Sequence, residues 1–133
     1  MLIFTMTQNE LPAFTDLLPE SVINHVGSEG YFTTAAIDDE GYPLGALQFC
    51  VDGDPKNIHV ASLEWIYVIP EARKESIAWH LHNSYKNVLL DTKIPISQVD
   101  CKDNLTDDIR NFLLALGYKS LGDGRFILNI PRP

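Results

Sequence analysis

The clearest pattern of apolar positions in the chain lies between Ala61 and Leu90. It opens with an uninterrupted run of strand-forming residues from Leu63 to Ile69, in which both faces are largely apolar. Pro70 has no N–H group to donate, so it ends the strand. After a short loop, apolar residues return at helical spacing, at Ile77, Ala78, Leu81, Tyr85, Val88 and Leu89. The pattern predicts a central strand of a sheet, a tight loop and an amphipathic helix.

The segment before Gly27 predicts a short strand and two short helices joined at a proline. Leu2 to Thr5 has the composition of a strand, and Asn9 is the expected N-cap, with Pro12 in the first turn. Pro19 ends the first helix or begins the second. The apolar residues expected to face inward are Leu11, Phe14, Leu17, Leu18, Val22, Ile23 and Val26.

Two strands joined by a turn follow, at Tyr31 to Ile37 and Pro43 to Val51. Gly45 inside the second strand indicates a bulge or a close approach of two backbones. A second turn, at residues 52–57, leads into the central strand. We expect these three strands to form an antiparallel meander.

The C-terminal part alternates between strand and helix. Ile94 to Cys101 contains a short strand, and a helical crossover predicts that it runs parallel to the central strand, Ile58 to Val68. Thr106 is the expected N-cap of a helix that ends at Gly117. Its buried face is expected to comprise Ile109, Phe112, Leu113 and Leu116. With a closing strand from 125 to 130, the order predicts an α+β fold, a mixed and mostly antiparallel sheet flanked by helices, in one domain over residues 1–133.

Composition narrows the function classes. The net charge of −8 argues against a basic nucleic-acid surface and is weakly compatible with a cationic substrate such as an amine. No apolar run is long enough to span a membrane. Cys50 and Cys101 lack metal or redox spacing, so a cytoplasmic location is expected. His80 and His82 lie two apart on the expected helix and therefore point to different sides, so no metal site is expected.

The segment from Leu63 to Arg73, LEWIYVIPEAR, resembles the fourth strand and following loop of the GNAT superfamily of acyl-CoA N-acyltransferases. Residues 41–47, GYPLGAL, are similar to the second hairpin of that family, and residues 116–118, LGY, to the end of its last helix. The resemblance covers nearly the whole chain in the order of its elements. It implies a GNAT-like fold and transfer of an acetyl group from acetyl-CoA to an amine.

In that family the loop contains Arg or Gln, two residues, Gly, one residue, and Gly or Ala. Its backbone amides hold the pyrophosphate of acyl-CoA at the N-terminus of a helix. The resemblance aligns this motif with residues 73–78, RKESIA, so Arg73 and Ala78 match, Ser76 replaces the first glycine, and Glu75 adds a negative charge. The cofactor-binding residues implied are Ile66, Val68, Arg73, Lys74, Ser76 and Ala78.

Glu64 is the candidate general base. Strict alternation along the strand places Glu64 on the same face as Ile66 and Val68, where apolar neighbours are expected to raise the pKa of its carboxyl. Family members often carry a general base on this strand, so the resemblance implies that Glu64 deprotonates the amine through water. A solvated glutamate, or one paired with a lysine, is the alternative.

Two further positions bear on function. The general acid of the family is a tyrosine four residues before the glycine of its Gly-Phe or Gly-Tyr pair, and here that position is Leu113. Ser76, Glu75 and Leu113 favour an alternative, a non-catalytic GNAT-like binding or interaction module, such as half of a tandem protein. Trp79 falls on the polar side of its helix, so either another element covers it or it contacts a partner domain or a second copy.

Overall fold

The computed structural model describes residues 1–52, 59–101 and 105–131 of the chain. Its strands form a seven-stranded sheet in the order β1-β2-β3-β4-β5-β7-β6. The strands are β1 (Leu2–Thr5), β2 (Tyr31–Ile37), β3 (Pro43–Asp52), β4 (Val60–Val68), β5 (Ile96–Asp100), β6 (Lys119–Gly122) and β7 (Arg125–Asn129). The predicted central position of β4 and its parallel pairing with β5 are both confirmed, and every other pairing is antiparallel. Ile58 and the predicted turn beyond Asp52 lie outside the described residues.

β6 was absent from the sequence-based prediction. All four of its residues are exposed, so no apolar alternation marks it. It is a short edge strand that pairs with β7 through a turn in which Gly122, Asp123 and Gly124 all have positive φ angles. The glycines of residues 122–124 indicated a turn before the closing strand, which is correct, but the strand that precedes this turn was missed.

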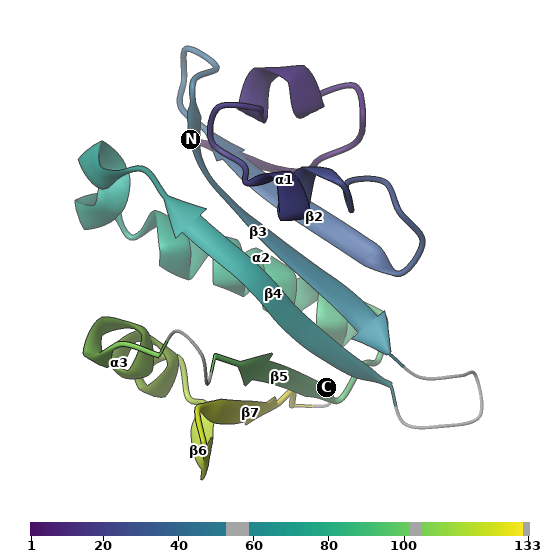
Figure 1. Cartoon of the computed structure of the whole chain (residues 1–133), viewed down its shortest axis with the longest axis vertical. Coiled ribbons are helices and arrows are strands. Elements are labelled where there is room, and N and C mark those ends of the chain that lie inside the picture. Colours follow the sequence, from purple (N-terminus) through teal and green to yellow (C-terminus); the bar gives the residue numbers. More distant parts are fainter. Residues whose placement is uncertain (53–58, 102–104, 132–133) are drawn as a thin grey trace.

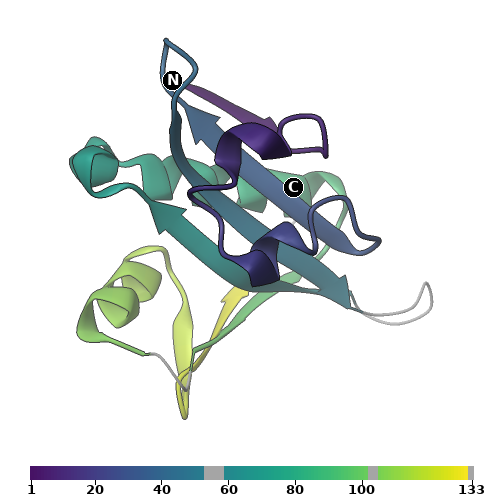
Figure 2. The same cartoon turned by 45° about the horizontal axis from the view of Figure 1, so that its top comes forward.

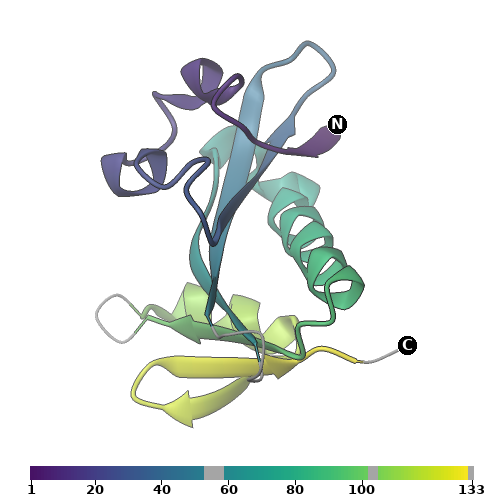
Figure 3. The same cartoon turned by 90° about the vertical axis from the view of Figure 1, so that its right-hand side faces the viewer.

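Helices cover both faces of the sheet, as Figures 2 and 3 show. The N-terminal segments η1 (Leu11–Phe14, a 3₁₀ helix) and α1 (Glu20–Ile23) lie against one face. α2 (Ile77–Asp91) lies against the opposite face and buries Ile77, Leu81, His82, Tyr85 and Leu89. The prediction of Asn9 as N-cap is wrong, because Glu10 occupies that position and accepts hydrogen bonds from Thr7.

The last helix, α3 (Asp107–Ala115), begins where the sequence predicts. Thr106 accepts a hydrogen bond from the amide of Ile109 at 3.2 Å, so the N-cap prediction is confirmed. Leu113 is fully buried in the core beneath α2, whereas Ile109, Phe112 and Leu116 are only partly buried. The predicted residues therefore do face the core, but three of the four are less deeply buried than expected.

A chain of buried polar side chains ties α2 to β5. His82 Nε2 lies 2.7 Å from the Tyr118 hydroxyl, which lies 2.8 Å from Ser97 Oγ. Ser97 Oγ in turn lies 2.6 Å from the Tyr85 hydroxyl. All four residues are buried, so Tyr85, which the amphipathic pattern placed on this helix face, and His82, which it did not include, both help to position the start of β5.

Membrane-crossing helices and metal-binding clusters are both absent from the described residues. No helix there has the length and apolar content needed to cross a bilayer. In the same part of the chain, no group of three or more His, Cys, Asp or Glu side chains is arranged to hold a metal ion.

Candidate functional site

The two central parallel strands separate partway along their length. β4 and β5 pair only from Val60–Ile96 to Ser62–Gln98, although β4 continues to Val68. Figure 1 shows the two strands diverging towards their carboxyl ends. Between them lies a cleft of about 180 Å³. Its lining comes from β4, from the end of β5 and from α3, and comprises Leu63, Glu64, Trp65, Ile66, Val99, Asp100, Cys101, Ile109, Phe112 and Leu113.

Glu64 is the extra residue of a β-bulge. Gln48 pairs with Trp65 and the next residue of β3, Phe49, pairs with Leu63, so Glu64 has no opposite residue. A bulge reverses the alternation of side chains beyond it. Leu63, Ile66 and Val68 therefore pack together on the α2 face, whereas Trp65 packs on the face of the N-terminal helices.

The predicted face of Glu64 is consequently wrong. Its carboxylate does not share the apolar face of Ile66 and Val68, but is exposed and accepts a hydrogen bond from the thiol of Cys50, with Sγ 3.0 Å from Oε1. Burial, and secondarily the Glu64 carboxylate, raise the pKa of the Cys50 thiol to about 12. Cys50 is therefore a neutral hydrogen-bond donor to Glu64 and not a thiolate.

A second hollow, of about 190 Å³, opens on the other side of Glu64. It lies between α1 and the strands β2, β3 and β4. Its lining comprises Ser21, Val22, His25, Tyr31, Gln48, Glu64 and Trp65. Glu64 and Trp65 line both this hollow and the cleft between β4 and β5. The bulge therefore places one exposed carboxylate where two cavities adjoin.

Beyond the bulge, the backbone of β4 turns polar groups towards the cleft side. The amide of Ile69 donates to Leu44 of β3 at 2.9 Å. Because alternate residues of a strand direct their N–H and C=O groups to opposite sides, the groups of Val68 and Ile66 point away from β3. Arg73 Nε donates to the Val68 carbonyl at 3.0 Å, which agrees with that direction. Ile66 and Val68 themselves direct their side chains into the core.

The sequence predicted a tight loop after β4, and the structure has a short helix there. Pro70–Glu75 forms a 3₁₀ helix, η2, in which the amide of Ala72 donates to the Ile69 carbonyl. Pro70 favours this because its fixed φ suits the first turn of a helix. Some amides expected to be free are therefore used within the turn.

Ser76 stands between η2 and α2 in the left-handed backbone region, with φ 60° and ψ 25°. Glycine adopts this conformation at least cost, which gives a physical reason for a glycine at the corresponding family position. The Ser76 side chain makes no capping hydrogen bond, and the first turn of α2 contains no acidic residue. The N-terminus of α2, including Ala78, is therefore not neutralised by its own side chains.

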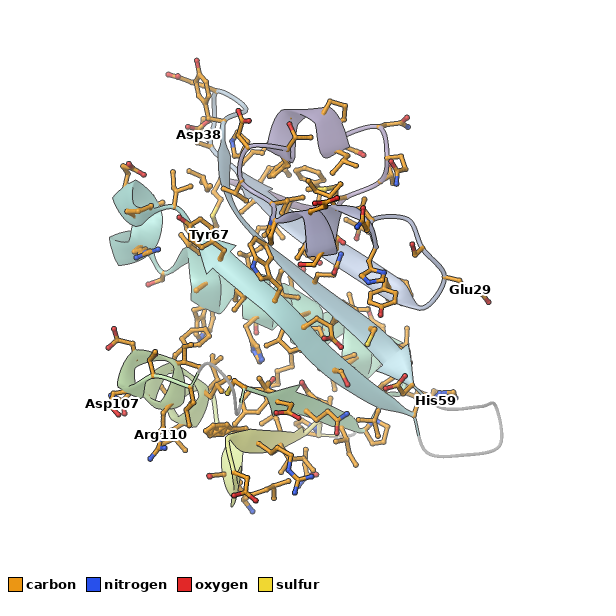
Figure 4. The ribbon with its side chains drawn as sticks, in the orientation of Figure 1. Glu29, Asp38, His59, Tyr67, Asp107 and Arg110 are labelled. Carbon is orange, nitrogen blue, oxygen red and sulfur yellow. The ribbon has the colours of Figure 1, made fainter. Side chains whose placement is uncertain are left out.

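Arg73 folds back over the end of β4. Its guanidinium carbon lies 5.5 Å from the centre of the Tyr67 ring, and Figure 4 shows Tyr67 close to the carboxyl end of that strand. The positive charge thus lies beside the strand end that precedes η2. The side chain of Lys74 lies outside the described parts of the chain.

Carboxylates gather on the opposite side of η2. Asp38, Asp39, Glu71 and Glu75 line a hollow of about 570 Å³ together with Met1 and four apolar residues. The Met1 amino group pairs with Asp39 at 3.0 Å, so one of these charges is balanced. Glu75, which the sequence marked as unfavourable for phosphate, is therefore part of a larger acidic surface.

No family model and no curated protein sequence matches this chain. Solved structures do match it. A ribosomal-protein-alanine N-acetyltransferase from Brucella melitensis superposes with a TM-score of 0.76 at 15% identity, covering 91% of this chain and 94% of that one. The GNAT family N-acetyltransferase YhbS from Escherichia coli, in complex with CoA, gives a TM-score of 0.76 at 14% identity over 98% and 81% of the two chains. An aminoglycoside 6'-N-acetyltransferase from Acinetobacter haemolyticus gives 0.73 at 18% identity over 90% and 92%.

The chain has the GNAT acetyltransferase fold. The fold expected from the sequence resemblance is thereby confirmed. Within it, the position expected to carry the general-acid tyrosine of GNAT enzymes is Leu113, which is fully buried and lines the cleft. A leucine supplies no proton, so this wall of the cleft is apolar.

Sequence reasoning missed several features of this candidate site. The bulge was missed because strict alternation was assumed, and the only signal was a carboxylate inside an otherwise apolar strand. Cys50 lacked metal or redox spacing, and nothing in the sequence indicated its hydrogen bond to Glu64. Tyr31 and His25, which stack at 4.0 Å beside the second hollow, carried no spacing that linked them to β4.

Proposed function

We propose that this chain transfers an acetyl group from acetyl-CoA to an amine. The observation that carries the proposal is the position of Glu64, an exposed carboxylate on the wall of two adjoining hollows. A transferase that brings two substrates together needs adjacent sites with a base between them. The similarity in fold to N-acetyltransferases supports this reaction class.

The residues present fit a CoA group in part. The left-handed conformation at Ser76 and the uncapped start of α2 suit a pyrophosphate, with Ala78 in the first turn and Arg73 and Lys74 supplying positive charge. The polar groups of Ile66 and Val68 suit an extended amide chain in the cleft. When bound, acetyl-CoA supplies the thioester whose acetyl group is transferred.

Glu64 then performs the proton chemistry. An amine reaches the protein mostly as an ammonium ion, and Glu64 accepts one proton from it, directly or through water. The freed lone pair attacks the acetyl carbon, the new C–N bond forms and the C–S bond breaks. The second proton passes from the nitrogen to solvent, Glu64 releases its proton to solvent, and solvent protonates the departing thiolate because Leu113 cannot.

A non-catalytic binding module is the second candidate. Leu113 supplies no acid, and the carboxylates beside η2 repel a pyrophosphate. These two observations favour a module that has kept the fold without the reaction. The expected cytoplasmic location and the partner contact through Trp79 stay predictions. Trp79 is 51% exposed on α2, so no element of the described chain covers it fully.

The deciding experiment measures acetyl transfer to a panel of amines together with acetyl-CoA binding by titration calorimetry. Glu64→Gln is expected to lower kcat/KM by about 100-fold and to remove its dependence on pH at the acidic limb. Glu40→Gln, which changes an exposed carboxylate in the β2–β3 turn, serves as the matched control. Binding of acetyl-CoA without transfer to any amine supports the module, and equal rates in the two variants exclude Glu64 as the base.

A further inference from the structure

We infer that the acceptor is a primary ammonium on an unbranched aliphatic chain, without an anionic group next to the nitrogen. This inference rests on the proposed function and assigns its acceptor site to the hollow between α1 and β4. Here that hollow is called the α1 pocket, lined by Ser21, Val22, His25, Tyr31, Gln48, Glu64 and Trp65.

The charge of the α1 pocket selects a cation. Glu64 is the only acidic side chain of its lining, and the lining contains no Lys or Arg among the described residues. The pKa of the Tyr31 phenol is raised by burial first, and then by Cys50, Glu64 and Asp52, of which the two carboxylates bring negative charge near that ring at neutral pH. Among the described residues, the lining of the cleft adds Asp100 and contains no Lys or Arg, and Figure 4 shows Arg110 pointing away from β4. A carboxylate beside the amine would meet repulsion here without a partner.

The walls of the α1 pocket suit an alkyl ammonium. Tyr31 stacks on His25 with ring planes 4° apart, and Trp65 is only half-buried on the other wall. Aromatic faces attract an alkylated cation, and a carboxylate at the end of the pocket orients it. Gln48 does not compete for the ligand with its amide nitrogen, which donates to Val22 and Thr33 instead.

The size of the α1 pocket suits a short acceptor chain. Its volume is about 190 Å³. A linear amine of four to six carbons fits such a space. The nitrogen of a chain lying in the pocket reaches Glu64, beyond which the cleft begins.

The test uses Trp65 as a reporter. The chain has two tryptophans, so Trp79→Phe, on the opposite face of the sheet, leaves Trp65 as the sole emitter. Fluorescence titrations at pH 7.5 compare n-pentylamine, 1-pentanol and norleucine, which carries a carboxylate beside its amine. We expect a saturable change with pentylamine and at least tenfold weaker binding of the other two. Trp65→Leu, with Trp79 retained, is expected to show no response to pentylamine.

The outcomes separate this inference from the proposed function. If norleucine or pentanol binds as tightly as pentylamine, the charge argument is wrong. If the protein acetylates some amine while pentylamine leaves Trp65 unchanged, acetyl transfer stands and the α1 pocket is not the acceptor site. Saturable binding of pentylamine without acetyl transfer would support the α1 pocket as an amine-binding site and contradict the proposed acetyltransferase activity. Absence of both binding and transfer overturns both.

Discussion

The thiol of Cys50 on β3 donates a hydrogen bond to the carboxylate of Glu64 on β4, with Sγ 3.0 Å from Oε1. The contact exists because the bulge turns Glu64 away from the face it would occupy in a regular strand. Cys50 is buried whereas Glu64 is exposed, so the donor is fixed and the acceptor borders both hollows. The hydrogen bond from Cys50 therefore fixes the orientation of the Glu64 carboxylate.

Cys50→Ala is expected to lower kcat/KM for acetyl transfer by about fivefold, and Cys50→Ser to restore most of it. The expected loss is that of a hydrogen bond to a charged group, and it is at the small end of that range because a thiol is a weak donor. The KM for acetyl-CoA should stay unchanged, since Cys50 lines neither the cleft nor the loop. Steady-state kinetics over a range of pH checks this, with Glu40→Gln as the control. Equal kinetics in Cys50→Ala and the wild type would show that the contact has no role in orientation.

The order of strands and helices could be predicted because burial imposes period 2 on a strand and period 3.6 on a helix. Pro70 and Gly117 marked element ends, and Thr106 marked a cap, for reasons that are local to the backbone. Gly45 was also interpreted correctly, since a Cβ there would lie 2.5 Å from the Tyr67 carbonyl oxygen. Each of these features depends on a few residues that lie close together in the sequence or on the backbone of a single residue.

The site was less predictable because its geometry depends on register between strands. The bulge, in which β4 has one residue more than β3, decides whether Glu64 faces α1 or α2. The alternation of side chains along β4 alone contains no information about this bulge. The acidic hollow beside η2 likewise joins Met1, the β2–β3 turn and η2, which are far apart in sequence. The exposed strand β6 lacked an apolar signal altogether.

Leu113→Tyr tests whether the cleft lacks only an acid. Leu113 lines the cleft, so a tyrosine at this position gains space there for its ring. Enlarging a buried side chain is expected to cost about 1–3 kcal/mol of stability. If the variant folds, its kcat should be equal to or above that of the wild type, because the phenol can protonate the departing thiolate. Single-turnover assays measure this, and Leu113→Phe controls for the ring alone. A lower rate in the tyrosine variant than in the phenylalanine variant would contradict this role.

The loop before α2 is expected to bind acetyl-CoA measurably but weakly. The helix N-terminus favours an anion by about 0.3–1 kcal/mol at an exposed site, whereas Glu75 repels it. Glu75→Gly should therefore tighten binding and Arg73→Ala should loosen it. Ser76→Gly should also tighten binding, because it removes a side chain from a position with positive φ.

Titration calorimetry of these variants at one fixed salt concentration checks the order of affinities. Glu40→Gln is the control for a change of net charge away from the loop. An equal gain in the control would assign the effect to net charge alone. If neither the wild type nor Glu75→Gly produces heat, the cofactor site has been lost and the binding-module alternative is preferred.

The buried chain from Tyr85 to His82 has a preferred direction. Tyr85 can donate to Ser97, Ser97 to Tyr118, and Tyr118 to Nε2 of His82, so that each hydroxyl donates once. The opposite direction leaves the fully buried Tyr85 hydroxyl without an acceptor among the described contacts. His82 is therefore neutral with its proton on Nδ1. Burial, and secondarily Lys86, lower the pKa of His82 to about 4.

Stability should consequently fall as the pH is lowered from 7 to 5. The unfolded chain takes up a proton near the ordinary pKa of 6.5, whereas the folded chain resists protonation of His82 until about pH 4. The stabilisation is complete above pH 6.5 and is lost between these two values, by about 2 kcal/mol from pH 7 to pH 5. Urea unfolding at both pH values measures it. His82→Gln, which keeps an acceptor but does not titrate, should lose less stability over this range, whereas His80→Gln should behave as the wild type. An equal loss in His82→Gln and the wild type would show that other groups cause the pH dependence.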